Sequence, residues 1–304
     1  MKPHTENGTK EARVSLFSLL TSNRLLLIGV IIILLFFLTA VFGPLLVRHD
    51  PEVMNVKHQF VPPSKEHLLG TDQFGRDVLS RIIYGTRLSC LVSLLSVGIA
   101  ATAGVAIGLL AGYFTGVLDD ILMRLMDIML TFPVILLAIG LIAFAGPKTS
   151  NVIIAIGVVY TPQFARVIRS SVLVVRDQEY VEAAVVVGAN DASIILTQIL
   201  PNCLPVIIVQ VTLSLAAAII LEAALSFLGL GTPPPAPSWG RMLSEARNFI
   251  SLAPWNAVFP GISIITVVMG LNFIGDGIRD ILDPKLRHLI RSSIVKKKLE
   301  NSNE

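Results

Sequence analysis

The sequence has few charged residues and almost no cysteine. Only 15% of its 304 residues are charged, 53% are hydrophobic and the mean hydropathy is +0.75. An ordinary soluble domain carries about 25% charged residues. This composition excludes a soluble domain and indicates a protein that crosses a membrane several times.

Metal and disulfide chemistry are also poorly represented. Cys90 and Cys203 lie in or beside apolar segments and fit no Cys-x-x-Cys or Cys/His pattern, so we read them as small core residues. His67, Asp72 and Asp77 are possible ligands in one segment, but their spacing matches no metal motif. We therefore predict no metal site. The basic residues flank apolar segments, so the net charge of +3 does not indicate nucleic-acid binding.

Catalytic motifs are absent as well. The sequence contains no GxxxxGK[ST] phosphate-binding loop, no HExxH and no GxSxG. The chain therefore cannot cradle ATP phosphates itself, and any ATPase must be a separate polypeptide. We predict no catalytic residue and no cofactor.

What the chain does have is long apolar runs. Residues 25–47 carry no charge and are long enough to cross a hydrocarbon layer of about 30 Å. This run is longer than the apolar part of a usual signal peptide, so we expect an uncleaved first span. Six spans are predicted in all, at about 25–47, 88–118, 128–145, 152–168, 205–228 and 257–275.

The segments around the spans define the domain organisation. We expect a cytoplasmic tail over 1–24, the first span over 25–47, an extracytoplasmic connection over 48–85, a five-span core over 86–280 and a basic cytoplasmic tail over 281–304. Apolar positions in 78–83 predict a short helix on the membrane surface. Pro133 should kink the third span. Because basic residues concentrate in the two tails, both termini and the loop 176–202 are predicted to be cytoplasmic.

That loop is predicted to form an elbow of two short helices. One narrow face of the first helix is made of Val181, Ala184, Val185 and Gly188. Gly188 can end this helix in a left-handed conformation, Asn190, Asp191 or Ser193 can cap the next one, and Pro201 should stop it.

Several residues of the elbow resemble the EAA motif of ABC-importer permeases, which is the loop that docks into the ATPase subunit. The matching residues are Glu182-Ala183-Ala184, Gly188 and Ile199-Leu200-Pro201. The sequence departs from the pattern at Gln198, where relatives often carry a basic residue. The resemblance implies that coupling to the ATPase depends on shape and apolar contact, through Glu182, Ala183, Ala184, Gly188 and Pro201.

The rest of the chain is similar to the C-type subunit of dipeptide and oligopeptide permeases. The matching segments are Leu69-Gly70-Thr71-Asp72, Gly75-Arg76-Asp77, Ala111-Gly112-Tyr113, Leu225–Gly231, Ser238-Trp239-Gly240, and Gly275–Asp280 with Asp283-Pro284. The resemblance implies an all-α, type-I ABC importer permease (MetI-like) fold in a bacterial cell membrane. It also implies a second permease subunit, one or two ATPase subunits, an extracytoplasmic solute-binding protein and a peptide substrate.

Two alternatives remain open at this point. A permease of the same family could carry nickel or another metal chelate. An ion-coupled secondary transporter would need charged residues inside the spans, and Glu222 is the one acidic residue that offers itself.

Glu222, Asn272 and Asp276 are the candidate residues of a translocation path. A charged Glu at the centre of a span costs about 2.5–3.5 kcal/mol, so Glu222 should face the bundle interior or a wet path. Alternatively, Glu222 could lie near enough to the outer interface to be solvated. Asp276 could simply pair with Arg279 one turn later.

Overall fold

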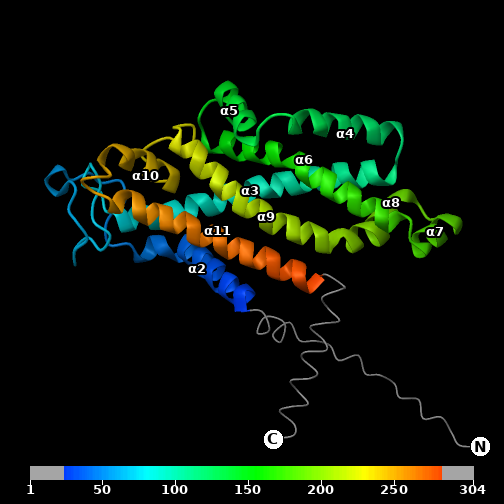
Figure 1. Cartoon of the computed structure of the whole chain (residues 1–304), viewed down its shortest axis with the longest axis horizontal. Helices are drawn as coiled ribbons and strands as arrows, with labels where there is room; N and C mark the ends of the chain where they lie inside the picture. Colours follow the sequence, from blue (N-terminus) through cyan, green and yellow to red (C-terminus); the bar gives the residue numbers. More distant parts are fainter. Residues whose placement is uncertain (1–23, 283–304) are drawn as a thin grey trace, which may run out of the picture.

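The computed structural model describes residues 24–282 and is an elongated helical bundle (Figure 1). The predicted tails, 1–24 and 281–304, lie almost entirely outside these residues. No β-strand is present in the described part of the chain, so the all-α prediction is confirmed. A connection after the first helix lies at one end of the bundle, and the predicted elbow lies at the other (Figure 1).

Five helices are long and apolar enough to cross a membrane, and a bent pair brings the number of spans to six. The five are α2 (Arg24–Leu46), α3 (Val78–Tyr113), α6 (Thr149–Arg176), α9 (Leu200–Phe227) with the short helices before it, and α11 (Trp255–Leu282). The bent pair is α4 (Val117–Leu130) and α5 (Val134–Ala145).

The third span is broken rather than kinked. The helices α4 and α5 meet at 91° around Pro133, which cannot donate a backbone hydrogen bond. At the end of α4, the Thr131 hydroxyl donates to Ile128 O at 2.6 Å and the Phe132 N–H donates to Met129 O at 3.4 Å, the carbonyl that residue 133 would otherwise bond. With 12 residues, α5 is about 18 Å long and too short to cross alone. The guanidinium of Arg169 holds α4 against α6 through both carboxylate oxygens of Asp119, at 2.5 and 2.6 Å.

The prediction of a separate surface helix over 78–83 was wrong. These residues are the first turns of α3, which is capped by the Asp77 side chain accepting from Ser80 N–H at 2.8 Å. Arg81 is only 1% exposed, because the connection and α10 (Trp239–Ala246) cover this end of the helix. The apolar pattern indicated a helix correctly, but the covering segments that bury its polar face were not visible in it.

Close packing of α3 on α6 forms the centre of the bundle. Gly104, Gly108 and Gly112 line the side of α3 that faces α6. A Cβ atom added at Gly108 would lie 2.7 Å from Ala165 O and 2.9 Å from Ile168 Cβ. Small residues at four-residue spacing allow helix backbones to approach in this way inside a membrane. The glycine content of the predicted second span therefore has a packing role.

An ion-pair network closes the end of the bundle opposite the elbow. The Arg76 guanidinium lies 2.6 Å from Asp72 Oδ2 and 2.7 Å from Glu245 Oε2, and Arg81 Nη2 lies 3.4 Å from that same oxygen of Glu245. These contacts join the connection, α3 and α10. Asp72, which the sequence offered as a possible ligand, is therefore occupied by structural contacts.

Candidate functional site

The first helix of the elbow, α7 (Glu179–Val186), ends as predicted. Gly188 has a φ of +83°, in the left-handed region that favours glycine. Gly188 N–H donates to Val185 O at 2.9 Å, and Ala189 N–H donates to Ala184 O at 3.0 Å. This pair of bonds is the Schellman arrangement, which satisfies the last carbonyls of a helix. The chain consequently reverses sharply on the outer surface of the protein.

The second helix of the elbow does not stop at Pro201. Asn190 caps it as predicted, accepting from Ala192 N–H at 3.0 Å, and α8 (Asp191–Ile194) then runs into a π-helical turn. In this wider turn Leu200 N–H donates to Ile195 O, and α9 continues directly from there. Pro201 lies in the first turn of α9, where no N–H is required, so it is tolerated. The elbow and α9 therefore form one continuous helical path.

The inner side of the elbow is an apolar core shared with two spans. Val181, Ile194 and Ile199 are at most 2% exposed. They pack in one cluster with Leu109 of α3 and with Ile168 and Val172 of α6. The elbow is thus seated on α3 and α6.

Hydrogen bonds also join the elbow, α3 and α6. The Tyr113 hydroxyl, at the end of α3, donates to Asp191 Oδ1 at 2.7 Å. Arg176, at the end of α6, donates to Tyr113 O at 3.1 Å and to the Thr115 hydroxyl at 3.0 Å. The Tyr113 bond therefore ties the elbow to the end of α3, and the Arg176 bonds tie the end of α6, from which the elbow begins, to that same end of α3.

The outer side of the elbow is exposed and largely apolar. Val185, Val186 and Val187 are 54%, 85% and 87% exposed, and Leu196 is 59% exposed. Glu182, Ala183, Gly188 and Pro201 are also exposed, whereas Ala184 is half-buried. The four residues expected on one face are therefore split: Val181 points into the core, whereas Val185 and Gly188 are exposed. Val186 and Val187 were not among the residues expected on that face. A signal for them was present, because three consecutive valines cannot all face the core from one side of a helix.

Glu222 lies in the packed interior between α9 and α3. Its side chain accepts from the Ser226 hydroxyl at 2.7 Å and from the Ser89 hydroxyl of α3 at 3.3 Å. The residue is 1% exposed, so the alternative of a solvated carboxyl was wrong. In this conformation Glu222 links two spans and is closed off from any open path.

The other two candidate path residues lie on α11. Asn272 is half-buried and Asp276 is exposed. Within residues 24–282, no ion pair joins Asp276 to Arg279, so the local-pair alternative was also wrong. Glu222 thus lies buried against α3, whereas Asn272 and Asp276 lie on α11, and none of the three lines the apolar fissure described next.

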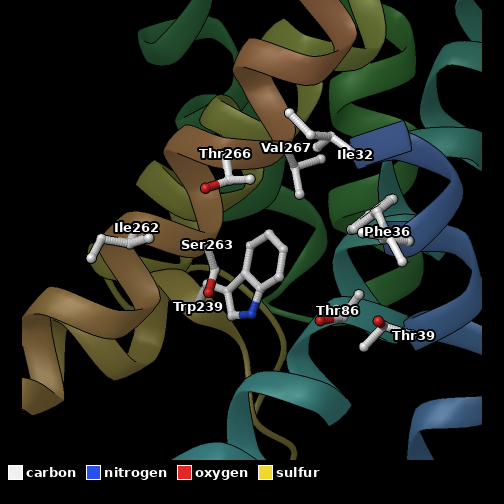
Figure 2. A pocket seen from close by; sticks show the side chains of 10 residues that line it. Ile32, Phe36, Thr39, Thr86, Trp239, Ile262, Ser263, Thr266 and Val267 are labelled. Carbon is white, nitrogen blue, oxygen red and sulfur yellow. The ribbon is translucent and has the colours of Figure 1, made fainter. Parts of the chain in front are cut away.

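An apolar fissure of about 270 Å³ lies between α2 and α11 (Figure 2). The Trp239 indole lies between Ile262, Ser263 and Thr266 of α11 and Phe36 of α2. Three polar groups that line the fissure are already hydrogen-bonded: the indole N–H and the Thr86 hydroxyl donate to Ile82 O at 3.1 and 2.9 Å, and the Ser263 hydroxyl donates to a carbonyl of its own helix at 2.9 Å. The fissure therefore suits an apolar chain rather than the charged ends of a peptide.

Comparisons with known proteins agree with this architecture. Residues 104–288 match the family model "Binding-protein-dependent transport system inner membrane component", and residues 17–63 match "N-terminal TM domain of oligopeptide transport permease C". The chain is 48% identical over 271 residues to the dipeptide transport system permease protein DppC of Alkalihalophilus pseudofirmus, covering 89% of each chain. It is 45% identical to the glutathione transport system permease protein GsiD of Pectobacterium atrosepticum, covering 74% of this chain and 75% of that protein.

A solved structure shows the same fold. One chain of the MetNI methionine ABC transporter, in an inward-facing conformation, superimposes with a TM-score of 0.56 at 18% identity, covering 67% of this chain and 97% of that chain. The predicted type-I importer permease fold is thereby confirmed. This multi-pass membrane protein belongs to the family of binding-protein-dependent transport system inner membrane components.

Proposed function

We propose that this chain is a permease subunit of an ATP-driven peptide importer, and that a separate ATPase docks on the elbow, residues 177–202. The observation that carries the proposal is an exposed apolar surface, around Val186 and Val187, which lies outside the spans and is rigidly held by α3 and α6. Such a surface at the end of a membrane bundle is suited to a partner protein.

The apolar and acidic residues of the elbow indicate which surface on the ATPase would be complementary to it. Residues 177–202 contain four carboxylates, Asp177, Glu179, Glu182 and Asp191, and no Lys, Arg or His. Asp191 is taken by Tyr113, which leaves three for a partner. The groove should therefore be apolar at its centre and basic at its rim. Gln198 adds no charge, which agrees with docking by shape.

The arrangement of the bundle supports an alternating-access mechanism. Closure of the ATPases would move the elbow, and the elbow would move α3, α6 and α9, to which it is joined. A second permease subunit would complete the path, and a solute-binding protein would deliver substrate at the end that carries the connection and α10. The start of α2 and the end of α11 lie toward the elbow (Figure 1), and we assign that side of the bundle to the cytoplasm.

Uptake in cells tests this function. Deletion of the gene should abolish uptake of a labelled dipeptide, and the wild-type gene should restore it. Depletion of ATP with the ion gradients clamped should stop uptake, whereas collapse of the gradients with ATP maintained should not. The reverse pattern would identify an ion-coupled transporter. Uptake of a nickel chelate, but of no peptide, would replace the proposed substrate.

Glu222→Gln tests the path role of this carboxyl. If α3 and α9 separate during transport, Glu222 becomes accessible and can bind the amino group of a passing peptide. We then expect a raised KM for uptake with little loss of folded protein, since Gln retains an acceptor for the Ser hydroxyls. Glu222→Leu serves as the comparison, because it leaves Ser89 and Ser226 unpaired and should lower stability. Unchanged uptake kinetics in Glu222→Gln would remove Glu222 from the path.

A further inference from the structure

Three histidines gather in the connection between α2 and α3, at the end of the bundle opposite the elbow. The ring centroids of His49 and His58 lie 4.9 and 5.8 Å from that of His67. One donor atom from each of His58, Glu66 and His67 lies within 4.8 Å of the other two. Imidazole and carboxylate groups at such distances are the ligands that zinc and related ions prefer.

His67 is oriented as a metal ligand would be. Its Nδ1 lies 3.0 Å from Asp77 Oδ1, so an N–H at Nδ1 would donate to this carboxylate, and in the neutral ring Nε2 then keeps the lone pair that binds a metal. Asp77 is itself fixed, since its other oxygen accepts from the backbone N–H and the hydroxyl of Ser80 at 2.8 and 2.7 Å. A carboxylate that holds the second nitrogen of a histidine is the usual support of a metal-ligating imidazole.

The Nε2 atom of His67 is buried and has no hydrogen-bond partner. His67 is 6% exposed, so water does not freely satisfy this nitrogen. A buried, unpaired polar atom is unfavourable in a folded protein and calls for a specific explanation. A metal ion bound at Nε2 would remove this penalty.

The connection holds the other two ligands near His67. His58 O accepts from the Thr71 hydroxyl at 2.5 Å, and Glu66 O is 3.2 Å from His49 Nε2. Gly70 N–H donates to His67 O at 2.9 Å, which closes the turn after that residue. The ligand positions are thus set by backbone contacts that do not require the ion.

We propose that His58, Glu66 and His67 bind a divalent transition-metal ion of the zinc class, with Asp77 orienting His67. The fourth position would be taken by water. The ion would tie His58 to the turn that carries Glu66 and His67, in addition to the hydrogen bonds and the ring contact already present there. This site does not depend on the transport function, because its residues lie apart from the elbow and from Glu222.

Metal titration of the purified full-length chain in detergent tests the proposal. The protein carries a tag without histidine and is first stripped with a chelator. We expect one Zn²⁺ per chain in competition with a chelating dye, and visible absorption of a four-coordinate ion when Co²⁺ replaces Zn²⁺. Absence of stoichiometric binding would overturn the site.

Variants separate this site from incidental binding. His67→Ala should abolish binding, and His58→Ala and Glu66→Gln should weaken it at least about tenfold, a loss typical even for a supporting group. His58 is half-buried and Glu66 is exposed, so these two variants should fold normally. Asp77→Asn retains a helix cap but should weaken binding by about 10–100-fold.

The matched control is Glu52→Gln, which removes an exposed carboxylate of the same connection and should leave binding unchanged. The remaining histidines, His4 and His288, are replaced together by alanine as a second control. Wild-type affinity in His58→Ala and Glu66→Gln, or loss of binding in the His4/His288 variant, would refute the site.

Discussion

Replacement of Gly188 by leucine is expected to abolish uptake and to remove the ATPase from the purified complex, while the chain itself still folds. The φ of +83° would cost a leucine about 1–2 kcal/mol, which a bundle of this size should survive. A Cβ at Gly188 meets no atom of this chain within 4 Å. The added side chain therefore projects outward, toward the proposed ATPase groove. Uptake assays and co-purification of the ATPase measure the effect.

Two variants isolate the docking effect from backbone strain. Gly188→Asn keeps a residue that tolerates the left-handed region and should lose less uptake than leucine. Gly229→Leu is the matched control, because Gly229 has a φ of +82°, equally open space and the same pair of helix-ending hydrogen bonds, but lies away from the elbow. Normal uptake in Gly188→Leu, or an equal loss of the ATPase in Gly229→Leu, would contradict docking at this position.

Replacement of Gly108 by leucine is expected to prevent accumulation of folded protein. Its Cβ would lie 2.7 Å from Ala165 O and 3.0 Å from Arg169 N, and these backbone atoms cannot move unless α6 moves. Ordinary overpacking costs about 1–3 kcal/mol, and separation of two helices should exceed that range. The yield of monodisperse protein after detergent extraction measures the loss.

Gly98→Leu on the same helix is the control. Gly98 is exposed, and an added Cβ there meets nothing within 4 Å. Both substitutions raise helix propensity equally, so the difference in yield reports the contact with α6 alone. Similar yields of the two variants would show that α3 and α6 do not pack as described.

Much of the fold is predictable from the sequence because membrane spans are defined by local composition. The helical class, six spans and the Gly188 turn follow from runs of apolar residues and one glycine before a polar cap. The break at Pro133 and the passage through Pro201 did not follow. Pro133 lies at the junction where the chain turns by 91° between α4 and α5, whereas Pro201 follows a π-helical turn and lies in the first turn of α9, where no N–H is required and the path continues.

The elbow could be predicted from the sequence, whereas the histidine cluster could not. The elbow could be found because its residues are contiguous, although Val181 points into the core and the exposed Val186 was not among the residues expected on the outer face. The histidine cluster could not be found, since His49, His58 and His67 lie nine residues apart in a connection of mostly irregular backbone, where sequence spacing does not place side chains on one face. Only the folded connection shows that His49 and His58 both lie beside His67. It also shows that Asp77 contacts His67 and at the same time caps α3.

The glycine contact between α3 and α6 has a consequence for motion. Where backbones touch, side-chain rearrangement cannot absorb a displacement, so the two helices should behave as one rigid body and any sliding must occur at their outer interfaces. The elbow is seated on both of these helices. Glu222 of α9 accepts a hydrogen bond from the Ser89 hydroxyl of this body at 3.3 Å, beside the apolar packing of Leu221 and Leu225. Sliding of α9 against the α3–α6 body would break that hydrogen bond and free one oxygen of the Glu222 carboxylate.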